Sequence, residues 1–256
     1  MIEPAPRYPK PLILHSFDVR FDRRSFGEPL SRLRAIPIVD NGEPLVDLRD
    51  ACPDVVLRPG CLPFLRKTVA AMVNEVQAAL PTGCKLAVGT GLRTWEMQTE
   101  IRTNVEASMR EKHPEWSAAA LQRNVNRMVA PLELKSPPPH TTGAALDVGV
   151  LNPDGTPMDF TASDDFWATA PTYLHTLPDH ARENRIMLIR AMEDAGLTNY
   201  VGEWWHWSYG DQGWALRVGS PTACYGSVVL EDAESKRLPK EEEKTDPETV
   251  AEQNSD

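Results

Sequence analysis

Residues 138–151 read PPHTTGAALDVGVL and combine a proline-rich turn with the start of an apolar strand. Prolines at positions 137–139 favour an extended backbone ahead of His140, and Gly143 with the two following alanines allows close backbone packing. Asp147 stands at the head of a short apolar run, which predicts a buried strand. A histidine and an aspartate that enter one pocket of small residues are reasonable metal ligands, because zinc accepts imidazole nitrogen and carboxylate oxygen.

A second segment, EWWHW at residues 203–207, places Glu203 three residues before His206 in a cluster of tryptophans. Burying a carboxylate is costly unless the group is paired, hydrogen-bonded or bound to a metal. The tryptophans exclude water, which raises the pKa of a carboxylate and suits a group that moves a proton. Both segments also have a structural interpretation. The first would then be a loop histidine with a capping aspartate, and the second a core strand with Glu203 at its rim.

Taken together, the two segments supply two histidines, one aspartate and a spare glutamate. A hydrolytic zinc site needs three protein ligands, an open position for water and a general base that is not itself a ligand. The combination therefore points to a metal-dependent hydrolase more strongly than either segment alone.

Residue spacing around these segments predicts a mixture of helices and strands without regular βαβ alternation. That mixture is typical of the α+β class. Helical periodicity and capping residues predict helices at 61–80, from Thr94 onward, at 117–129 and at 181–195, the last closed by Gly196. Apolar and aromatic runs predict strands at 35–39, 85–88, 147–151 and 203–209.

The composition is that of a globular protein. Hydrophobic residues make up 41% of the 256 residues and charged residues 25%. No apolar run approaches the roughly 18 residues of a membrane helix, and the first residues lack the apolar stretch of a secretory signal. The four cysteines form no CxxC pair, so we expect reduced thiols, a cytoplasmic location and no membrane partner.

Charge is distributed unevenly along the chain. The net charge is −10, and residues 231–256 carry ten acidic and four basic residues without an aromatic residue. That composition predicts a disordered acidic tail at 231–256 after a single domain at 1–230. An acidic chain without a basic stripe also excludes nucleic acid as the expected partner.

In order and separation, the two motifs resemble those of the zinc-dependent D-alanyl-D-alanine dipeptidases of the VanX type and their D,D-carboxypeptidase relatives. The segment GLR at 91–93 resembles the Gly-Tyr-Arg element of that family, and GTPMDF at 155–160 resembles its segment ending Phe-Asp-Phe. The resemblance extends from about residue 25 to residue 226. It implies one α+β domain with a mixed or antiparallel sheet, flanked by helices, around a central zinc site.

The resemblance also implies a role for each matching residue. His140, Asp147 and His206 would hold one zinc ion per chain. Glu203 would take a proton from the attacking water and pass it to the departing amine, and Arg93 would face the developing oxyanion.

Two further roles concern substrate binding. Asp159 would receive the ammonium group of a short substrate. Pro138 stands where some members of the family have a serine. Thr141 or Thr142 would then supply the missing hydroxyl.

These observations predict a cytoplasmic zinc dipeptidase whose substrate is the small dipeptide D-alanyl-D-alanine. One alternative is a D,D- or L,D-carboxypeptidase that acts on longer muropeptides. Another is a non-catalytic zinc-binding module, although Glu203 would have no purpose beside a purely structural zinc. The sequence does not predict the oligomeric state.

Overall fold

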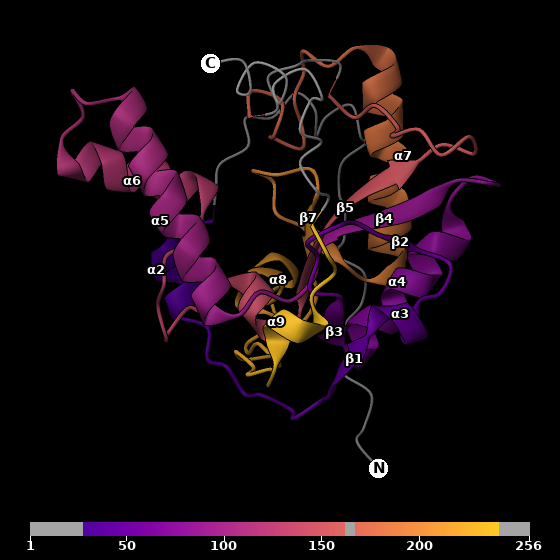
Figure 1. Cartoon of the computed structure of the whole chain (residues 1–256), viewed down its shortest axis with the longest axis horizontal. Coiled ribbons are helices and arrows are strands. Elements are labelled where there is room, and N and C mark those ends of the chain that lie inside the picture. The colour runs from indigo at the N-terminus through magenta and orange to yellow at the C-terminus, as the bar shows by residue number, and fades with distance from the viewer. Residues whose placement is uncertain (1–27, 162–166, 241–256) are drawn as a thin grey trace, which may run out of the picture.

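The computed structural model describes residues 28–161 and 167–240. At its centre lies a five-stranded mixed sheet in the order β2-β4-β5-β7-β6, in which only β2 and β4 run parallel (Figure 1). This architecture confirms the expected α+β fold with a mixed sheet. The strands are β2 (Val56–Leu57), β4 (Lys85–Thr90), β5 (Ala145–Leu151), β6 (Thr198–Asn199) and β7 (His206–Ser208).

A smaller antiparallel pair is formed by β1 (Leu45–Asp47) and β3 (Phe64–Arg66), and β3 leads directly into the helix that begins at Lys67. The other elements are helical. They are α2 (Leu30–Arg34), α3 (Leu48–Ala51), α4 (Lys67–Ala79), α5 (Trp95–Lys112), α6 (Ala118–Met128), the 3-10 turn η1 (Pro139–Thr142), α7 (Asp179–Ala195), α8 (Gln212–Val218) and α9 (Ala233–Lys236).

Helices α4 and α7 pack against each other and bury apolar residues in the main core. Val73 and Val76 of α4 and Met192 of α7 have no exposed surface. Fully burying one such side chain stabilises the fold by about 1.5–3 kcal/mol. Figure 1 shows α5 and α6 as a helical pair on the opposite side of the sheet, and residues of both helices line a cleft together with residues of β5.

Local capping chemistry sets the helix ends where the sequence predicts them. The side chains of Thr94 and Ser117 accept hydrogen bonds from the backbone N–H groups of Met97 and Ala120, at the starts of α5 and α6. Helix α7 ends at Gly196, whose φ of +101° favours glycine. These predictions are confirmed because they depend on short-range hydrogen bonds.

Three predicted elements are shorter than expected. The helix predicted at 61–80 begins only at Lys67, because the preceding residues form β3 and pair with β1. The strand predicted at 203–209 is limited to β7, and its first residues form a turn. At 35–39 only Ile38 makes a single bridge, to Ala223. In each case tertiary pairing, which periodicity does not encode, decides the outcome.

The predicted disordered tail needs a correction at its beginning. The backbone of Leu238 exchanges hydrogen bonds with Gly60 and Cys61, and its side chain packs against the main core. This apolar residue anchors 231–240 to the body, whereas 241–256 lie outside the described residues. Within the described part of the chain, none of the helices combines the length and apolar character needed to cross a membrane.

Arg185 of α7 is a buried cation that donates hydrogen bonds to several backbone carbonyl groups of the segment before α7. Its side chain is 1% exposed and donates to backbone carbonyl groups on both sides of residues 162–166. Burial lowers the pKa of Arg185 to about 10. The four acceptors are the carbonyl oxygens of Phe160, Thr169, Pro171 and Thr172.

We expect Arg185→Met to lower the free energy of unfolding by at least about 3 kcal/mol, because each buried carbonyl left without a donor costs about 1–3 kcal/mol. Urea unfolding measures the loss. The exposed Arg123 of α6 provides the matched control, and R123M is expected to stay within about 0.5 kcal/mol of wild type. Equal losses in the two variants would contradict the role given to Arg185.

Candidate active site

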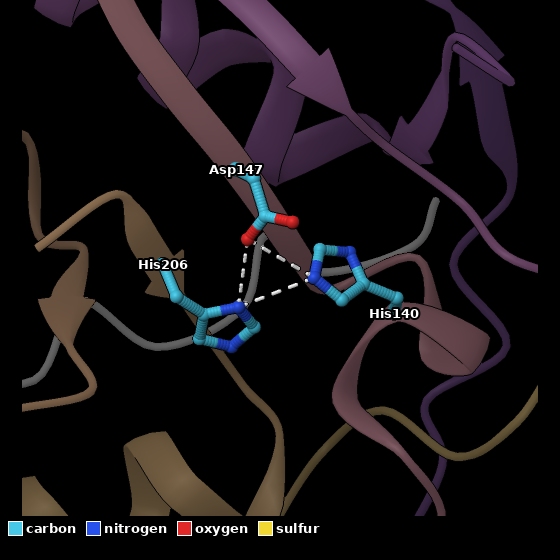
Figure 2. A group of neighbouring side chains, drawn as sticks. All are labelled: His140, Asp147 and His206. Atoms are coloured by element: carbon cyan, nitrogen blue, oxygen red, sulfur yellow. Dashed lines mark hydrogen bonds and ion pairs between the residues drawn. The ribbon is translucent and has the colours of Figure 1, made fainter. Parts of the chain in front are cut away.

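Three side chains from two separate segments of the chain converge on one point (Figure 2). They are His140 of η1, Asp147 of β5 and His206 of β7, and their candidate ligand atoms lie within 4.8 Å of one another. Oδ1 of Asp147 is 3.2 Å from Nε2 of His140 and 2.9 Å from Nδ1 of His206. The two histidine nitrogens are 3.2 Å apart. The structure thus brings together the three residues predicted to bind the metal.

Strand pairing places two of these ligands directly opposite each other. In the antiparallel register of β5 and β7, Asp147 faces His206. Directly opposite residues on antiparallel strands share a face of the sheet, with their Cβ atoms about 4.5–5.5 Å apart. Convergence of Asp147 and His206 therefore follows from the sheet itself.

The third ligand depends on a tight turn. Gly143 ends η1 with φ of +68°, a conformation that favours glycine. A Cβ atom at this position would lie 2.5 Å from Cδ2 of Leu45. The positive φ therefore favours glycine in the turn that presents His140, and a larger residue would also displace the side chain of Leu45.

Neighbouring groups orient the ligands. The carbonyl oxygen of Gly91 is 2.9 Å from Nδ1 of His140, which directs Nε2 toward the other ligands. Arg93 donates to Oδ2 of Asp147 at 3.1 Å and leaves Oδ1 facing the two histidines. Such outer contacts fix ring orientation and ligand basicity in metal sites.

The electrostatics of the three side chains fit a cation. Burial lowers the pKa of His140. Burial acts against the charged form of Asp147, but the neighbouring histidines hold its pKa well below the usual range. Burial acts against the charged form of His206, but the hydrogen bond to Asp147, together with the nearby negative charges, outweighs burial and raises the pKa. Two imidazoles and a carboxylate whose donor atoms converge in a buried place form a donor set suited to zinc and related first-row ions.

Glu203 lies in the turn just before β7 and is partly buried. Its backbone carbonyl accepts hydrogen bonds from the N–H of His206 and from the side chain of Asn199. Burial raises the pKa of the Glu203 carboxyl to about 7. This shift agrees with the prediction made from the surrounding tryptophans, and it gives a carboxylate that can both accept and release a proton near neutral pH.

A cleft of about 790 Å³ connects these groups. The three metal-ligand candidates, Glu203, Arg93 and Thr142 all line it. Sequence reasoning missed several other lining residues, because only the folded chain brings them to the cleft. Among these are Gln98, Trp167 and Tyr200.

Two predicted substrate-binding residues lie elsewhere. Thr141 is fully buried, and its hydroxyl contacts Pro138 and Ser227 instead of lining the cleft. Asp159 is not among the described residues that line the cleft, and its Oδ2 lies 3.0 Å from Nε2 of His180. The segment after β5 folds back along that strand, which carries Asp159 to the start of α7. The role predicted for Asp159 therefore has no support from its position.

We expect Zn²⁺ at about 100 times its dissociation constant to stabilise the wild-type protein by about 2.7 kcal/mol. His206→Ala removes one of three ligands and should abolish most of that gain, measured as the shift in the thermal midpoint. His180→Ala removes an exposed histidine away from the cleft and should keep the full gain. An undiminished shift in H206A would exclude this metal site.

The raised pKa of Glu203 predicts a pH-dependent stability of the metal-free protein. The folded state holds this proton up to about pH 7, whereas the unfolded chain loses it near 4.5, so stability falls as the pH rises between these values. Glu203→Gln should therefore stabilise the metal-free protein by about 1–3 kcal/mol at pH 8 and far less at pH 4.5. Urea unfolding at the two pH values measures both differences. A pH-independent difference would contradict the raised pKa.

Comparison with known proteins agrees with this geometry. The family model described as D-ala-D-ala dipeptidase, Peptidase_M15, matches residues 52–225, a span that contains all three metal-ligand candidates and Glu203. The D-alanyl-D-alanine dipeptidase of Synechocystis is 40% identical in an alignment that covers 80% of this chain and 99% of that protein. The chain therefore belongs to the Peptidase_M15 family of D-Ala-D-Ala dipeptidases and is a metallopeptidase.

Proposed function

We propose that this chain is a zinc-dependent dipeptidase that hydrolyses D-alanyl-D-alanine, with one zinc ion per chain. The observation that carries the proposal is the arrangement of Glu203, with its raised pKa, in the same cleft as a buried set of two histidines and one aspartate. The name of the Synechocystis relative supports the choice of substrate. The cytoplasmic location remains a prediction from the sequence.

In this proposal the chain's residues divide the chemistry among them. Zinc held by His140, Asp147 and His206 would supply a Lewis acid that polarises the scissile carbonyl and lowers the pKa of water. Glu203 accepts a proton from the attacking water and donates it to the leaving amine, so that a C–O bond forms as the peptide C–N bond breaks. Arg93 lines the cleft beside Asp147 and contributes positive charge toward the developing oxyanion.

The aromatic surroundings of Glu203 support its role as the proton carrier. Trp204 and Trp205 follow it directly, and both are less than a tenth exposed. A site shielded from water keeps the neutral and ionised forms of a carboxyl group close in free energy near neutral pH. A purely structural zinc site would gain nothing from this arrangement, which argues against the non-catalytic module.

One observation favours a second candidate function. The cleft volume of about 790 Å³ lies in the upper part of the range of pockets that enclose drug-sized ligands. Alanyl-alanine occupies only part of such a space. A carboxypeptidase that removes a terminal residue from longer muropeptides would use the same zinc and Glu203 chemistry with more of the cleft.

The decisive measurement is release of D-alanine from D-alanyl-D-alanine by the zinc-loaded protein. We expect turnover by wild type and a loss of at least about a hundredfold in kcat for Glu203→Gln, because the variant lacks the general base. Zinc affinity of E203Q should stay within a few-fold of wild type, since Glu203 is not a ligand.

Longer substrates distinguish the two candidate functions. Cleavage of a muropeptide pentapeptide without turnover of the dipeptide would replace the dipeptidase by the carboxypeptidase. A protein that binds zinc tightly and cleaves neither substrate would overturn both catalytic proposals.

A further inference from the structure

Arg66, at the end of β3, is a buried cation outside the set of residues assigned to the chemistry. Its side chain is 3% exposed. The guanidinium donates through Nε to the carbonyl oxygen of Thr142 at 2.9 Å and through Nη1 to that of Glu43 at 2.5 Å. Nη2 donates to the carbonyl oxygen of Gly226 at 3.0 Å and to Oδ2 of Asp40 at 2.8 Å. One side chain thus joins three segments of chain that are remote in the sequence.

The backbone of Arg66 holds the same turn. Its N–H donates to the carbonyl oxygen of Gly143 at 2.8 Å. Together with the bond from Nε to Thr142, Arg66 fixes two consecutive carbonyl groups directly after the metal-ligand candidate His140. A rotation of the turn would break both bonds.

The carbonyl groups of the turn receive their other donors from different places. The carbonyl oxygen of His140 accepts from the N–H of Arg93, and that of Thr141 accepts from the N–H of Val228. Arg66 therefore supplies two of the four donors to the backbone carbonyl groups of residues 140–143, and its bond to Gly226 also anchors the segment that supplies Val228.

The geometry of these bonds requires a guanidinium. Its forked N–H groups reach acceptors in several directions at once, whereas a lysine ammonium is a single point charge on a flexible stem. A buried cation is costly unless its hydrogen bonds are satisfied. Three of the four acceptors of the guanidinium are backbone carbonyl groups, one of them in the turn. The fourth acceptor, Asp40, is about one-third exposed.

We infer that Arg66 is a positioning residue for the metal site: it holds the turn 139–143 so that Nε2 of His140 meets Asp147 and His206. The inference rests on the metal site of the proposed function. It assigns Arg66 no contact with substrate. Without Arg66, part of the free energy of metal binding would be needed to order this turn, and the metal affinity would fall.

Zinc affinity tests the inference directly. We expect Arg66→Lys to weaken zinc binding about 10–100-fold, the usual range for outer contacts of metal ligands, measured by competition with a chromophoric chelator. In the zinc-saturated enzyme, kcat for D-alanyl-D-alanine should fall while KM changes less than about threefold, because Arg66 does not contact substrate. Arg66→Gln, which keeps an N–H donor without the buried charge, gives a second measurement if R66K fails to fold.

Two control variants separate positioning from general stability. Val76→Ala creates a cavity where α4 packs into the hydrophobic core. Val76 has no exposed surface, and it takes no part in the hydrogen bonds described above for the turn. The substitution should lower the free energy of unfolding and leave zinc affinity unchanged. Asp40→Asn removes the acidic partner of Arg66 but keeps the carbonyl acceptors, so zinc affinity should stay within about threefold of wild type.

The results discriminate among the possibilities. Zinc affinity of R66K within about threefold of wild type, or an equal loss in V76A, would overturn the inference. Weakened zinc binding in R66K, combined with a wild-type protein that does not cleave D-alanyl-D-alanine, would uphold the role of Arg66 and reject the proposed substrate.

Discussion

The antiparallel register of β5 and β7 is the constraint on which the site depends. Asp147 faces His206 on one face of the sheet, and the next pair, Leu146 and Trp207, is fully buried on the other face. Because side chains alternate between faces, a shift of one residue would exchange the ligands with the core pair. The apolar pair therefore fixes the positions of these two candidate ligands. Any register that withdrew Asp147 and His206 from the cleft would also expose a tryptophan and a leucine to water.

The same site concentrates groups whose burial disfavours folding. Asp147 is compensated by Arg93 and the two histidines, whereas burial raises the pKa of Glu203 to about 7. A carboxyl group held in this state contributes less to stability at neutral pH than an exposed one would. The proposed proton transfer favours the raised pKa nevertheless, since a carboxylate with an ordinary pKa is a weaker base toward the attacking water and seldom holds a proton at neutral pH. The raised pKa of Glu203 thus lowers the stability of the fold at the residue proposed to transfer the proton.

Sequence patterns predicted the features that depend on local chemistry. Thr94 caps the start of α5 and Gly196 the end of α7 through hydrogen bonds to nearby residues, and the two metal motifs are short enough to be recognised as segments. Patterns failed where distant contacts decide. Apolar spacing extended the helix of α4 into residues that pair with β1. The position of Asp159 beside α7 likewise depends on the fold, and its predicted role in substrate binding stays a prediction.

Buried arginines explain why the irregular segments around the cleft can be held at all. Turns and loops leave carbonyl groups without partners in a sheet or helix, and a buried carbonyl needs a donor. Arg66 satisfies carbonyl groups of the turn after His140. Arg185 satisfies the carbonyl group of Thr169, and its guanidinium lies over the ring of Trp204, the residue after Glu203. Each replaces several backbone pairings by one forked side chain. The sequence does not distinguish a buried arginine of this kind from an arginine on the surface. Its role depends on the carbonyl groups that it contacts, and only the fold brings those groups together.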